Sequence, residues 1–269
     1  MVTTTVLDTV AGSTVPLQTQ GDALQMIRDS FALSSSLWAN IALAGLSILA
    51  FVYMGRNLSS SRAKLIWVSV LLVPLVSISS YSSLISGITV AMLENPLSGE
   101  AVLSPWGRYL TWTFSTPAIL AALGLLAGTD FTKLFTAITM DIGMCVTGLA
   151  AAFTTSSVLI RWVFFGISTA FFLVVVYVLL AEWSEDAARA DTSEIFDSLR
   201  NLTVVLWFGY PVLWALGSDG LMILEPALTS WGYSGLDILA KYVFAFLLLR
   251  WVANNENVVA SNPSILGGD

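Results

Sequence analysis

The sequence of 269 residues contains no histidine and only one cysteine, Cys145. Without histidine, His-based metal sites and both Ser-His-Asp and Cys-His catalysis are excluded. A single cysteine cannot form a disulfide within the chain, and it does not indicate a redox compartment. The sequence also lacks a Gly-rich phosphate loop, a basic nucleic-acid patch and a carboxylate pair suited to a soluble cleft. We therefore expect no such enzyme chemistry, no metal and no nucleic-acid partner.

Charge is scarce as well. Only 11% of the residues are charged and 56% are hydrophobic, whereas a soluble domain carries about 25% charged residues. The mean hydropathy is +0.81. This composition predicts an integral membrane protein. The net charge of −7 lies in loops and termini, which suits very salty surroundings.

Seven apolar segments of membrane-spanning length follow one another along the chain. They run roughly over residues 34–55, 64–88, 106–127, 131–153, 158–182, 194–217 and 228–252. The pattern predicts an all-α bundle of seven transmembrane helices, in one membrane domain over residues 31–253. Residues 1–30 are expected to form an extracellular segment without a cleavable signal peptide, with an amphipathic turn or helix at 22–31. Residues 254–269 are expected to form a cytoplasmic tail.

The distribution of basic residues predicts the orientation. The connection between the first two segments carries Arg56, Arg62 and Lys64, whereas the loop ENPLSGEAVLSP after the second segment carries no basic residue. The positive-inside rule therefore places the N-terminus outside and the C-terminus in the cytoplasm of a multi-pass protein of the plasma membrane. The run DTSEIFDSL (191–199) predicts an Asp or Ser N-cap for the sixth helix.

The last segment carries a lysine in the middle of an apolar run, LDILAKYVFAF at residues 236–246. Lys241 and Asp237 are four residues apart and share one face of a helix. An ionisable residue at that depth is unfavourable by at least about 2.5 kcal/mol and marks a functional site by default. One interpretation is a structural ion pair. The other is covalent chemistry, because a lysine amine forms Schiff bases and a protonated Schiff base needs an anion nearby.

An elongated apolar ligand on that lysine would need a pocket lined by rigid aromatic side chains. Candidates are Trp207, Tyr210, Pro211 and Trp214 in the sixth segment, Trp112 in the third, and Met144 and Gly148 in the fourth. The glycine would leave room for a ring. Aromatic stripes are also typical of plain core, but a buried lysine on the next helix favours a pocket.

Three motifs carry a family resemblance: RYLTWTFSTP (108–117), LWFGYPVLW (206–214) and LDILAKYVFAF (236–246). They resemble the microbial rhodopsins, seven-helix proteins with all-trans retinal bound as a protonated Schiff base on the last helix. The runs MDIGMCVTGLAAA (140–152), SLWANIALAGLSIL (36–49) and LRWVANNE (249–256) are similar to the halorhodopsin branch. Members of that branch are light-driven inward chloride pumps, so the resemblance implies ion transport rather than enzymatic turnover.

The resemblance also implies roles for individual residues. Lys241 would carry retinal, Asp237 would be its counterion, and Arg108 would lie below the Schiff base. The retinal pocket would consist of Trp112, Thr116, Asp141, Met144, Gly148, Phe165, Phe172, Trp207, Tyr210, Pro211 and Trp214. Within it Thr116 and Asp141 would pair between helices, and Phe165 departs from the tryptophan often found there. Arg200 and Thr203 would form the cytoplasmic exit. The family further suggests a homotrimer in lipid, and we see no transducer signature.

The third segment indicates which ion is moved. Arg108, Thr111, Ser115 and Ala122 fall on one stripe of that helix. In proton-pumping relatives the positions of Thr111 and Ala122 hold carboxylic acids that accept and resupply the Schiff-base proton. Alanine holds no proton and a threonine hydroxyl is too weak a base. The sequence therefore argues against an outward proton pump.

The charge balance points to an anion instead. If Asp141 is neutral, the protonated Schiff base and Arg108 face only Asp237, and one positive charge is uncompensated. Such a charge at low effective dielectric is unfavourable by several kcal/mol. We therefore expect chloride or another halide, bound by Thr111, Ser115 and Arg108. The alternative for the hydroxyls is a hydrogen bond back to their own helix.

Light would swing the Schiff-base N–H towards the cytoplasm, and the halide would follow the moving charge inward. The loop 89–105, with Ser79 and Ser80 below it, is expected to control access from outside, and Pro105 replaces a polar residue of some relatives. Two other interpretations remain besides the proton pump. They are a sensory photoreceptor and a seven-helix protein without retinal, in which Lys241 makes only a structural ion pair.

Overall fold

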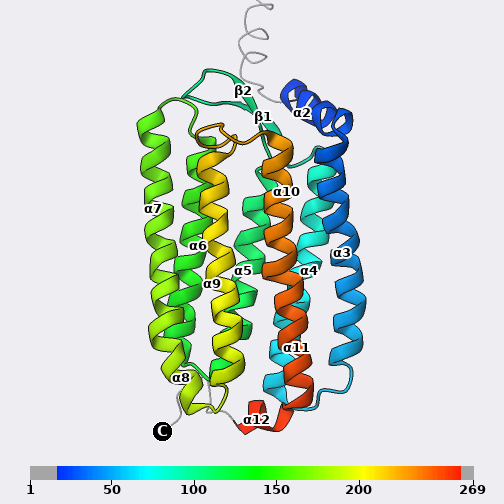
Figure 1. Cartoon of the computed structure of the whole chain (residues 1–269), viewed down its shortest axis with the longest axis vertical. Coiled ribbons are helices and arrows are strands. Elements are labelled where there is room, and N and C mark those ends of the chain that lie inside the picture. Colours follow the sequence, from blue (N-terminus) through cyan, green and yellow to red (C-terminus); the bar gives the residue numbers. More distant parts are fainter. Residues whose placement is uncertain (1–16, 262–269) are drawn as a thin grey trace, which may run out of the picture.

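The computed structural model describes residues 17–261. Upright helices form a bundle, and a short β-hairpin covers one of its ends (Figure 1). The elements are α2 (Leu17–Asp29), α3 (Phe31–Gly55), α4 (Ser61–Ile85), β1 (Ala91–Glu94), β2 (Ala101–Ser104), α5 (Gly107–Ala127), α6 (Phe131–Phe153), α7 (Val158–Tyr177), η1 (Val178–Glu182), α8 (Trp183–Arg189), α9 (Ser193–Leu216), α10 (Pro226–Asp237), η2 (Ile238–Val243), α11 (Phe244–Asn254) and α12 (Glu256–Ser261). Parts of the expected N-terminal segment (1–16) and C-terminal tail (262–269) lie outside the described residues.

Among residues 17–261, six helices are long and apolar enough to cross a membrane. One of them is the continuous run of α7, η1 and α8 over Val158–Arg189. A further helical run, formed by α10, η2 and α11, stands beside them along the height of the bundle (Figure 1). The prediction of an all-α membrane bundle is confirmed, and the β-hairpin is an addition to it.

Short polar side chains explain where several helices begin. An oxygen of Ser30, Ser60, Asp130 or Ser157 accepts a hydrogen bond from the backbone N–H three residues later, at 3.0–3.4 Å. Each thereby satisfies one N–H that the first turn of its helix leaves without a partner. The first two caps extend their helices by about one turn beyond the apolar runs at 34–55 and 64–88. The helix at residue 226 begins with proline, which suits the first helical position.

The predicted N-cap of the sixth membrane helix, α9, was wrong. Thr192 holds the N-cap position of α9, and its side chain makes no capping hydrogen bond. Its hydroxyl donates instead to the carbonyl of Leu126, at 3.0 Å, across to the end of α5. Asp191 before it has a φ of 55°. The N-cap position thus falls on Thr192 rather than on the expected Asp or Ser, and its side chain makes a contact between two helices instead of a cap.

The loop 89–105 contains an antiparallel hairpin, in which Ala91 lies opposite Ser104 and Glu94 opposite Ala101. The helix α2 lies at the same end of the bundle, which we call the hairpin end (Figure 1). It includes most of the stretch 22–31 for which a surface turn or helix was expected. The opposite end carries α8 and α12 (Figure 1), and we call it the tail end.

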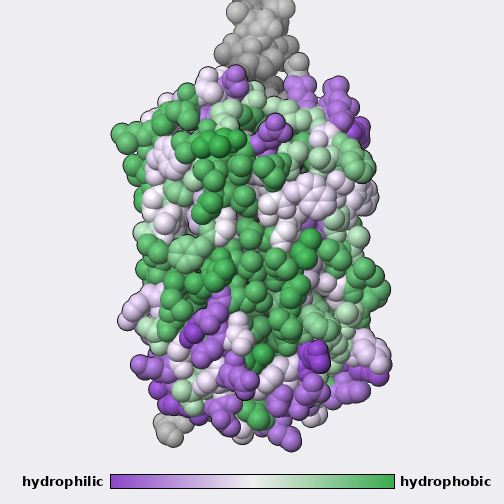
Figure 2. Space-filling model, viewed as in Figure 1, coloured by the Kyte–Doolittle hydropathy of each residue, from purple (hydrophilic) through white to green (hydrophobic). Residues whose placement is uncertain are grey.

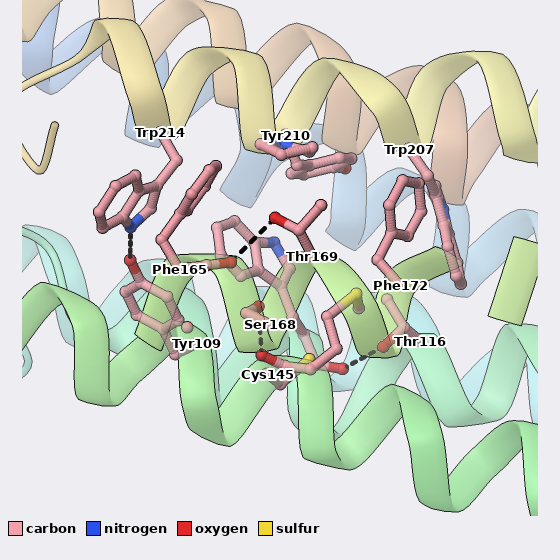
Figure 3. A pocket seen from close by; sticks show the side chains of 14 residues that line it. Tyr109, Thr116, Cys145, Phe165, Ser168, Thr169, Phe172, Trp207, Tyr210 and Trp214 are labelled. Atoms are coloured by element: carbon pink, nitrogen blue, oxygen red, sulfur yellow. Dashed lines mark hydrogen bonds between the residues drawn. The ribbon is translucent and has the colours of Figure 1, made fainter. Parts of the chain in front are cut away.

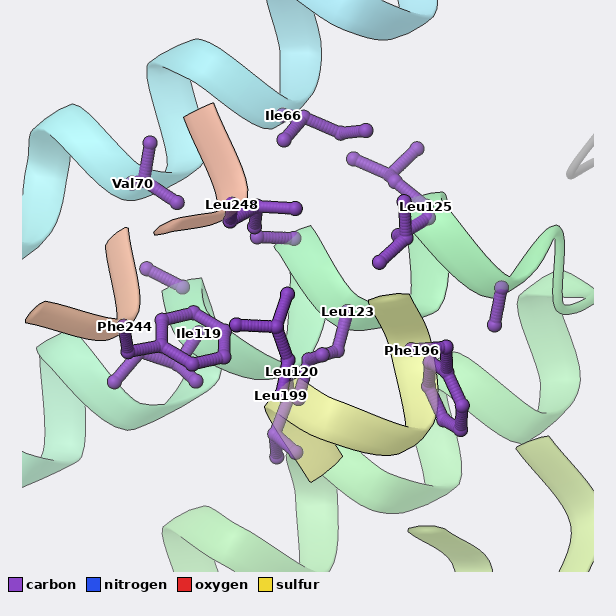
Figure 4. Packing of buried hydrophobic residues seen from close by; sticks show 14 of the residues in the cluster. Ile66, Val70, Ile119, Leu120, Leu123, Leu125, Phe196, Leu199, Phe244 and Leu248 are labelled. Carbon is purple, nitrogen blue, oxygen red and sulfur yellow. The ribbon is translucent and has the colours of Figure 1, made fainter. Parts of the chain in front are cut away.

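On the face shown in Figure 2, hydrophobic residues form a broad band between more polar ends. Inside the tail-end half, apolar side chains from several helices pack together (Figure 4). Ile119, Leu120 and Leu123 of α5 lie at its centre and are fully buried, with Phe196 of α9 and Phe244 of α11 among their neighbours. In a bilayer, contacts of this kind hold helices together by close packing, because lipid is as apolar as the side chains.

Candidate functional site

Lys241 and Asp237 form a buried ion pair on the last crossing. Each is 1% exposed, and Nζ lies 3.0 Å from Oδ1 of the carboxylate. The lysine belongs to the π-helical segment η2, which interrupts the run from α10 to α11. Segments of this kind are rare and frequently occur at functional sites. The expected one-turn spacing therefore brings the two charges into contact.

Two tyrosines hold the carboxylate of Asp237 from neighbouring helices. Tyr81 of α4 donates to Oδ2 and Tyr210 of α9 donates to Oδ1, each at 2.7 Å. Hydrogen bonds to an ionised acceptor are about twice as strong as neutral ones, so the anion is stabilised and oriented. The sequence interpretation missed Tyr81. The sequence offered one signal, a single tyrosine between serines (SSYSS) in an apolar segment. The structure shows that this tyrosine is fully buried.

An aromatic pocket lies between α5, α6, α7 and α9 (Figure 3). The space not filled by atoms is about 670 Å³, including the pocket's open mouth. The lining residues are Tyr109, Trp112, Thr116, Met144, Cys145, Gly148, Phe165, Ser168, Thr169, Phe172, Trp207, Tyr210, Pro211 and Trp214. Every residue expected for the pocket is among them except Asp141, while Tyr109, Cys145, Ser168 and Thr169 are additions.

The two ends of this pocket are closed by different residues. At one end Phe165 stacks on Trp214 with ring centroids 4.5 Å apart, and the indole donates to the hydroxyl of Tyr109 at 2.7 Å (Figure 3). Trp207 and Phe172 stand at the other end (Figure 3). Offset-stacked aromatic pairs are rigid and apolar, so they give the pocket a fixed shape. The pocket thus suits an elongated apolar ligand.

Gly148 lies where any side chain would crowd the pocket. A Cβ placed there would come 3.3 Å from the hydroxyl oxygen of Ser168 and 3.4 Å from the ring of Tyr109. The missing side chain therefore leaves space in the pocket wall, as the sequence suggested. Within residues 17–261 no group of three or more His, Cys, Asp or Glu side chains is placed to hold a metal ion.

Thr116 and Asp141 meet between α5 and α6, as expected. The threonine hydroxyl oxygen is 2.6 Å from Oδ2 of Asp141 and 2.7 Å from the carbonyl of Trp112. One hydroxyl has one hydrogen, so both contacts are satisfied if a protonated Asp141 donates to Thr116 and Thr116 donates to the carbonyl. Oδ1 of Asp141 has no partner in the described structure, which also suits a neutral carboxyl group.

The amine of Lys241 fits a covalent ligand in this pocket. Its Nζ is buried and makes no hydrogen bond within the described residues, although it lies beside Asp237. The carboxylate oxygen that it approaches also accepts from Tyr210, which lines the pocket. The buried amine is therefore next to an oriented anion, which Tyr210 connects to the aromatic cavity. Elongated apolar aldehydes such as retinal match this arrangement.

The two hydroxyls expected to bind a halide differ in their surroundings. Thr111 donates to the carbonyl of Gly107 at 3.1 Å and also contacts the hydroxyl of Ser80. Ser115 is 0% exposed, and its hydroxyl has no partner among the described residues. The hydrogen bond back to the helix therefore applies to Thr111 and not to Ser115. The free donor that a halide requires is on Ser115.

Arg108 lies on the same stripe of α5 and is 3% exposed. Its Nη2 donates to Ser230 at 2.9 Å, and its guanidinium carbon lies 4.8 Å from the centre of the Tyr233 ring. Nε has no partner within residues 17–261. The side chains of Arg108, Ser230 and Tyr233 border a second cavity, which we call the hairpin-end cavity. It is lined by Ile27, Leu33, Leu37, Leu84, Val90, Leu103, Pro105, Arg108, Ser218, Asp219, Pro226, Thr229, Ser230 and Tyr233.

Sequence interpretation missed two buried charges near this cavity, Asp219 and Arg161. Asp219, in the loop between α9 and α10, accepts from the Tyr109 hydroxyl at 3.4 Å. Burial raises the pKa of Asp219, while the charges of Arg161 and then Arg108 act in the opposite direction. Arg161 donates to the last carbonyls of α6, those of Ala151 and Ala152, at 3.2 and 2.8 Å. Both residues lie at the edges of apolar segments, where the sequence indicates exposure.

At the tail end, the expected exit residues lie one turn apart on α9. Arg200 is paired with Asp197 at 2.9 Å. Thr203 is fully buried, and its hydroxyl has no partner in the part of the chain that the structure describes. Of the expected pair, only Arg200 reaches the surface.

Comparisons with known proteins agree with this geometry. The family model of the bacteriorhodopsin-like proteins matches residues 31–255. A halorhodopsin of Halobacterium halobium (strain shark) is 67% identical over 259 residues, which cover 95% of this chain and 94% of the relative. The solved structure "Halorhodopsin, a light-driven chloride pump" superposes with a TM-score of 0.84 at 61% identity, over 86% of this chain and 99% of that one.

A bromide-bound halorhodopsin from Halobacterium salinarum superposes with a TM-score of 0.85 at 60% identity, over 88% of this chain and 99% of that chain. The matched region includes the last crossing with Lys241 and all of the pocket-forming helices. Identity of this extent over almost the whole chain leaves no room for a different fold. The protein is a multi-pass membrane protein that belongs to the bacteriorhodopsin-like family and, within it, to the halorhodopsins.

Proposed function

We propose that this protein is a light-driven inward chloride pump of the plasma membrane, with all-trans retinal attached to Lys241. The relatives named above support this, since one is described as a light-driven chloride pump and another holds bromide. The observation that carries the proposal is the hydroxyl of Ser115, which is buried and has no partner among the described residues, on the Arg108 stripe of α5.

When bound, retinal would supply light absorption and a change of shape that redirects a positively charged Schiff-base N–H. The protein's own residues would prepare this event. Tyr81 and Tyr210 keep Asp237 in place as an anion beside Lys241. The stacked rings of Phe165 and Trp214 confine the ligand, and the aromatic lining excludes water. Asp141 would stay neutral because it is fully buried in apolar surroundings.

The balance of buried charge supports a bound anion. Lys241, Arg108 and Arg161 are buried cations, whereas Asp237 and Asp219 are the anions that face them. A further buried carboxylate, Asp186 at the tail end, is already paired with Lys133 and Arg189. With Asp141 neutral, the three cations and two anions around Lys241 and the hairpin end therefore leave one positive charge there. A halide would remove this imbalance, since an uncompensated charge at low effective dielectric is unfavourable by several kcal/mol. Ser115 and Arg108 would hold it, with Thr111 in a secondary part.

The direction of transport follows from the proposed orientation. The tail end carries Arg56 just after α3 and Arg62 and Lys64 in the first turn of α4, together with Arg189 and Arg200. The positive-inside rule places this end, with residues 254–269, in the cytoplasm and the N-terminal residues 1–30 outside the membrane domain 31–253. A halide would then enter through the hairpin-end cavity and leave past Thr203 and Arg200. The apolar cluster of the tail-end half would prevent leakage between transport events.

A halide titration tests the binding site. Purified pigment in halide-free sulfate buffer should show a shift of its visible absorption band as chloride is added, because the anion lies near the chromophore's charge. Thr111→Asp should supply the missing negative charge and weaken halide binding by about tenfold or more. The neutral variant Thr111→Asn is the matched control. If chloride does not shift the absorption band of the unmodified protein, the result would contradict the proposed halide site.

Illumination of vesicles or cells tests the transport. A chloride importer should produce passive proton uptake that a protonophore increases. The same protonophore should abolish the signal of a proton pump. Light-driven acidification of the medium that persists without chloride would contradict the proposal and favour proton transport.

A further inference from the structure

A buried asparagine joins the hairpin to the loop between α9 and α10. Asn95 is 0% exposed. Its Nδ2 donates to the carbonyl oxygens of Ser218 at 2.9 Å and Gly220 at 3.2 Å, while its Oδ1 accepts from the N–H of Leu97 at 2.9 Å. The Ser218 hydroxyl donates in return to the carbonyl of Leu103 in β2. One side chain therefore connects two loops that are more than 120 residues apart in sequence.

The residue between the two anchored carbonyls is Asp219. It is 7% exposed and is the one acidic residue among those described as lining the hairpin-end cavity, where Arg108 is the one basic residue. Its own side chain is weakly held. Oδ1 has no partner within residues 17–261, and the Tyr109 hydroxyl is 3.4 Å from Oδ2. The position of this carboxylate therefore depends on the backbone on either side of it, which Asn95 holds.

We propose that Asn95 is a positioning residue that keeps Asp219 across the hairpin-end cavity and thereby sets the rate of halide exchange between the outside and Ser115. The inference rests on the proposed halide transport. A fixed carboxylate repels an anion that enters the cavity, so a halide passes when the loop moves. The hydrogen bonds of the Asn95 side chain go to the hairpin and the loop, and none goes to Arg108 or Ser115. Replacing Asn95 should therefore change the barrier to halide exchange and leave the halide affinity unchanged. The rate constants for halide binding and halide release should then change by the same factor.

The test uses the full-length pigment in detergent or lipid. Asn95→Ala should increase the rate of the chloride-induced absorption change after stopped-flow mixing, and the rate of its reversal on dilution, by about tenfold each, since two hydrogen bonds are lost. The equilibrium dissociation constant should stay unchanged within about twofold. Ser98→Ala is the matched control. Its exposed hydroxyl contacts Sδ of Met222 across the same two loops, and its exchange rates should equal those of the unmodified protein.

A double-mutant cycle shows whether Asn95 acts through the carboxylate. In an Asp219→Asn background, Asn95→Ala should increase exchange by less than about threefold, because the repelling charge is already absent. An equal increase in both backgrounds would overturn the role of Asp219. If Asn95→Ala yields no pigment, Asn95→Ser replaces it, since a serine oxygen can still accept from Leu97 but cannot reach both carbonyls.

Two results would overturn the inference itself. One is an exchange rate that Asn95→Ala leaves unchanged, and the other is a change confined to the dissociation constant. Both presuppose an unmodified protein whose absorption responds to chloride. An unmodified protein without that response would instead refute the proposed halide binding, so the two failures are distinguishable.

Discussion

The two halves of the bundle differ in how many buried polar side-chain atoms lack a hydrogen-bond partner among the described residues. In the tail-end half, apolar side chains around Leu123 fill the interior, and Thr203 Oγ1 and Trp183 Nε1 are the buried side-chain atoms described there without partners. The hairpin-end half has more of them, including Arg108 Nε, Asp219 Oδ1 and Thr229 Oγ1. Buried polar atoms are normally hydrogen-bonded to protein or water. The difference indicates that one half accepts water or ions while the other half is a barrier.

The largest effect is expected where the two halves meet, at Lys241. Lys241→Ala removes the amine that would bind retinal, so the variant should form no coloured pigment when retinal is added. Visible absorption of the purified protein measures this. Lys64→Ala, which alters an exposed lysine at the start of α4, should keep full colour. A stable pigment in Lys241→Ala would show that the attachment site is elsewhere.

The second-largest effect concerns the free energy of unfolding, which should respond differently to substitutions in the two halves. Leu123→Ala opens a cavity in the tail-end cluster and should lower the free energy of unfolding by about 2–5 kcal/mol. Thr229→Val removes a hydroxyl without a partner among the described residues and should change that free energy by less than about 1 kcal/mol. Denaturant-induced loss of colour measures both. Equal losses would mean that the hairpin-end half is packed as tightly as the barrier.

Halide affinity should depend more on Ser115 than on Thr111, although both lie on one stripe of α5. Ser115→Ala removes the hydroxyl with no partner in residues 17–261 and should weaken chloride binding by about 10–100-fold, as for a hydrogen bond to a charged group. Thr111→Val should have a smaller effect, since this hydroxyl already donates to Gly107. The absorption titration gives both constants. The reverse order would show that Thr111 is the main donor.

The smallest effect concerns the tail end, where Glu256 of α12 accepts from the backbone N–H groups of Ser60 and Ser59 at the start of α4. These two hydrogen bonds lower the pKa of Glu256 below its ordinary value of 4.5. A lowered pKa in the folded state stabilises the protein above the ordinary pKa, and this contribution is lost as the pH falls through the folded-state value.

Glu256→Gln should therefore lower the temperature of colour loss slightly at neutral pH, and the difference from the unmodified protein should shrink as the pH falls below 4.5. Thermal bleaching between pH 3 and pH 7 measures it. The control is Glu185→Gln, which changes an exposed carboxylate on α8 at the same end. A difference that persists unchanged in acid would mean that the charge of Glu256 does not matter.

Much of the candidate site could be predicted because it depends on local spacing. Asp237 and Lys241 meet because four residues make about one helical turn. Trp207, Tyr210 and Trp214 lie on one face of α9 for the same reason, and all three line the pocket. The prediction of the sixth-helix cap was wrong because Thr192 bonds to Leu126, a residue 66 positions away.

The amino-acid sequence by itself determined that the chain is a bundle of apolar helices with a lysine–aspartate pair on the last one. Composition and helical periodicity are local properties, and they need no knowledge of neighbouring helices. Only the tertiary structure decided that Tyr81 holds Asp237, that Ser115 rather than Thr111 keeps a free hydroxyl, and that Asn95 anchors the loop of Asp219. These features depend on which distant segments touch, and packing between helices, not sequence spacing, decides those contacts.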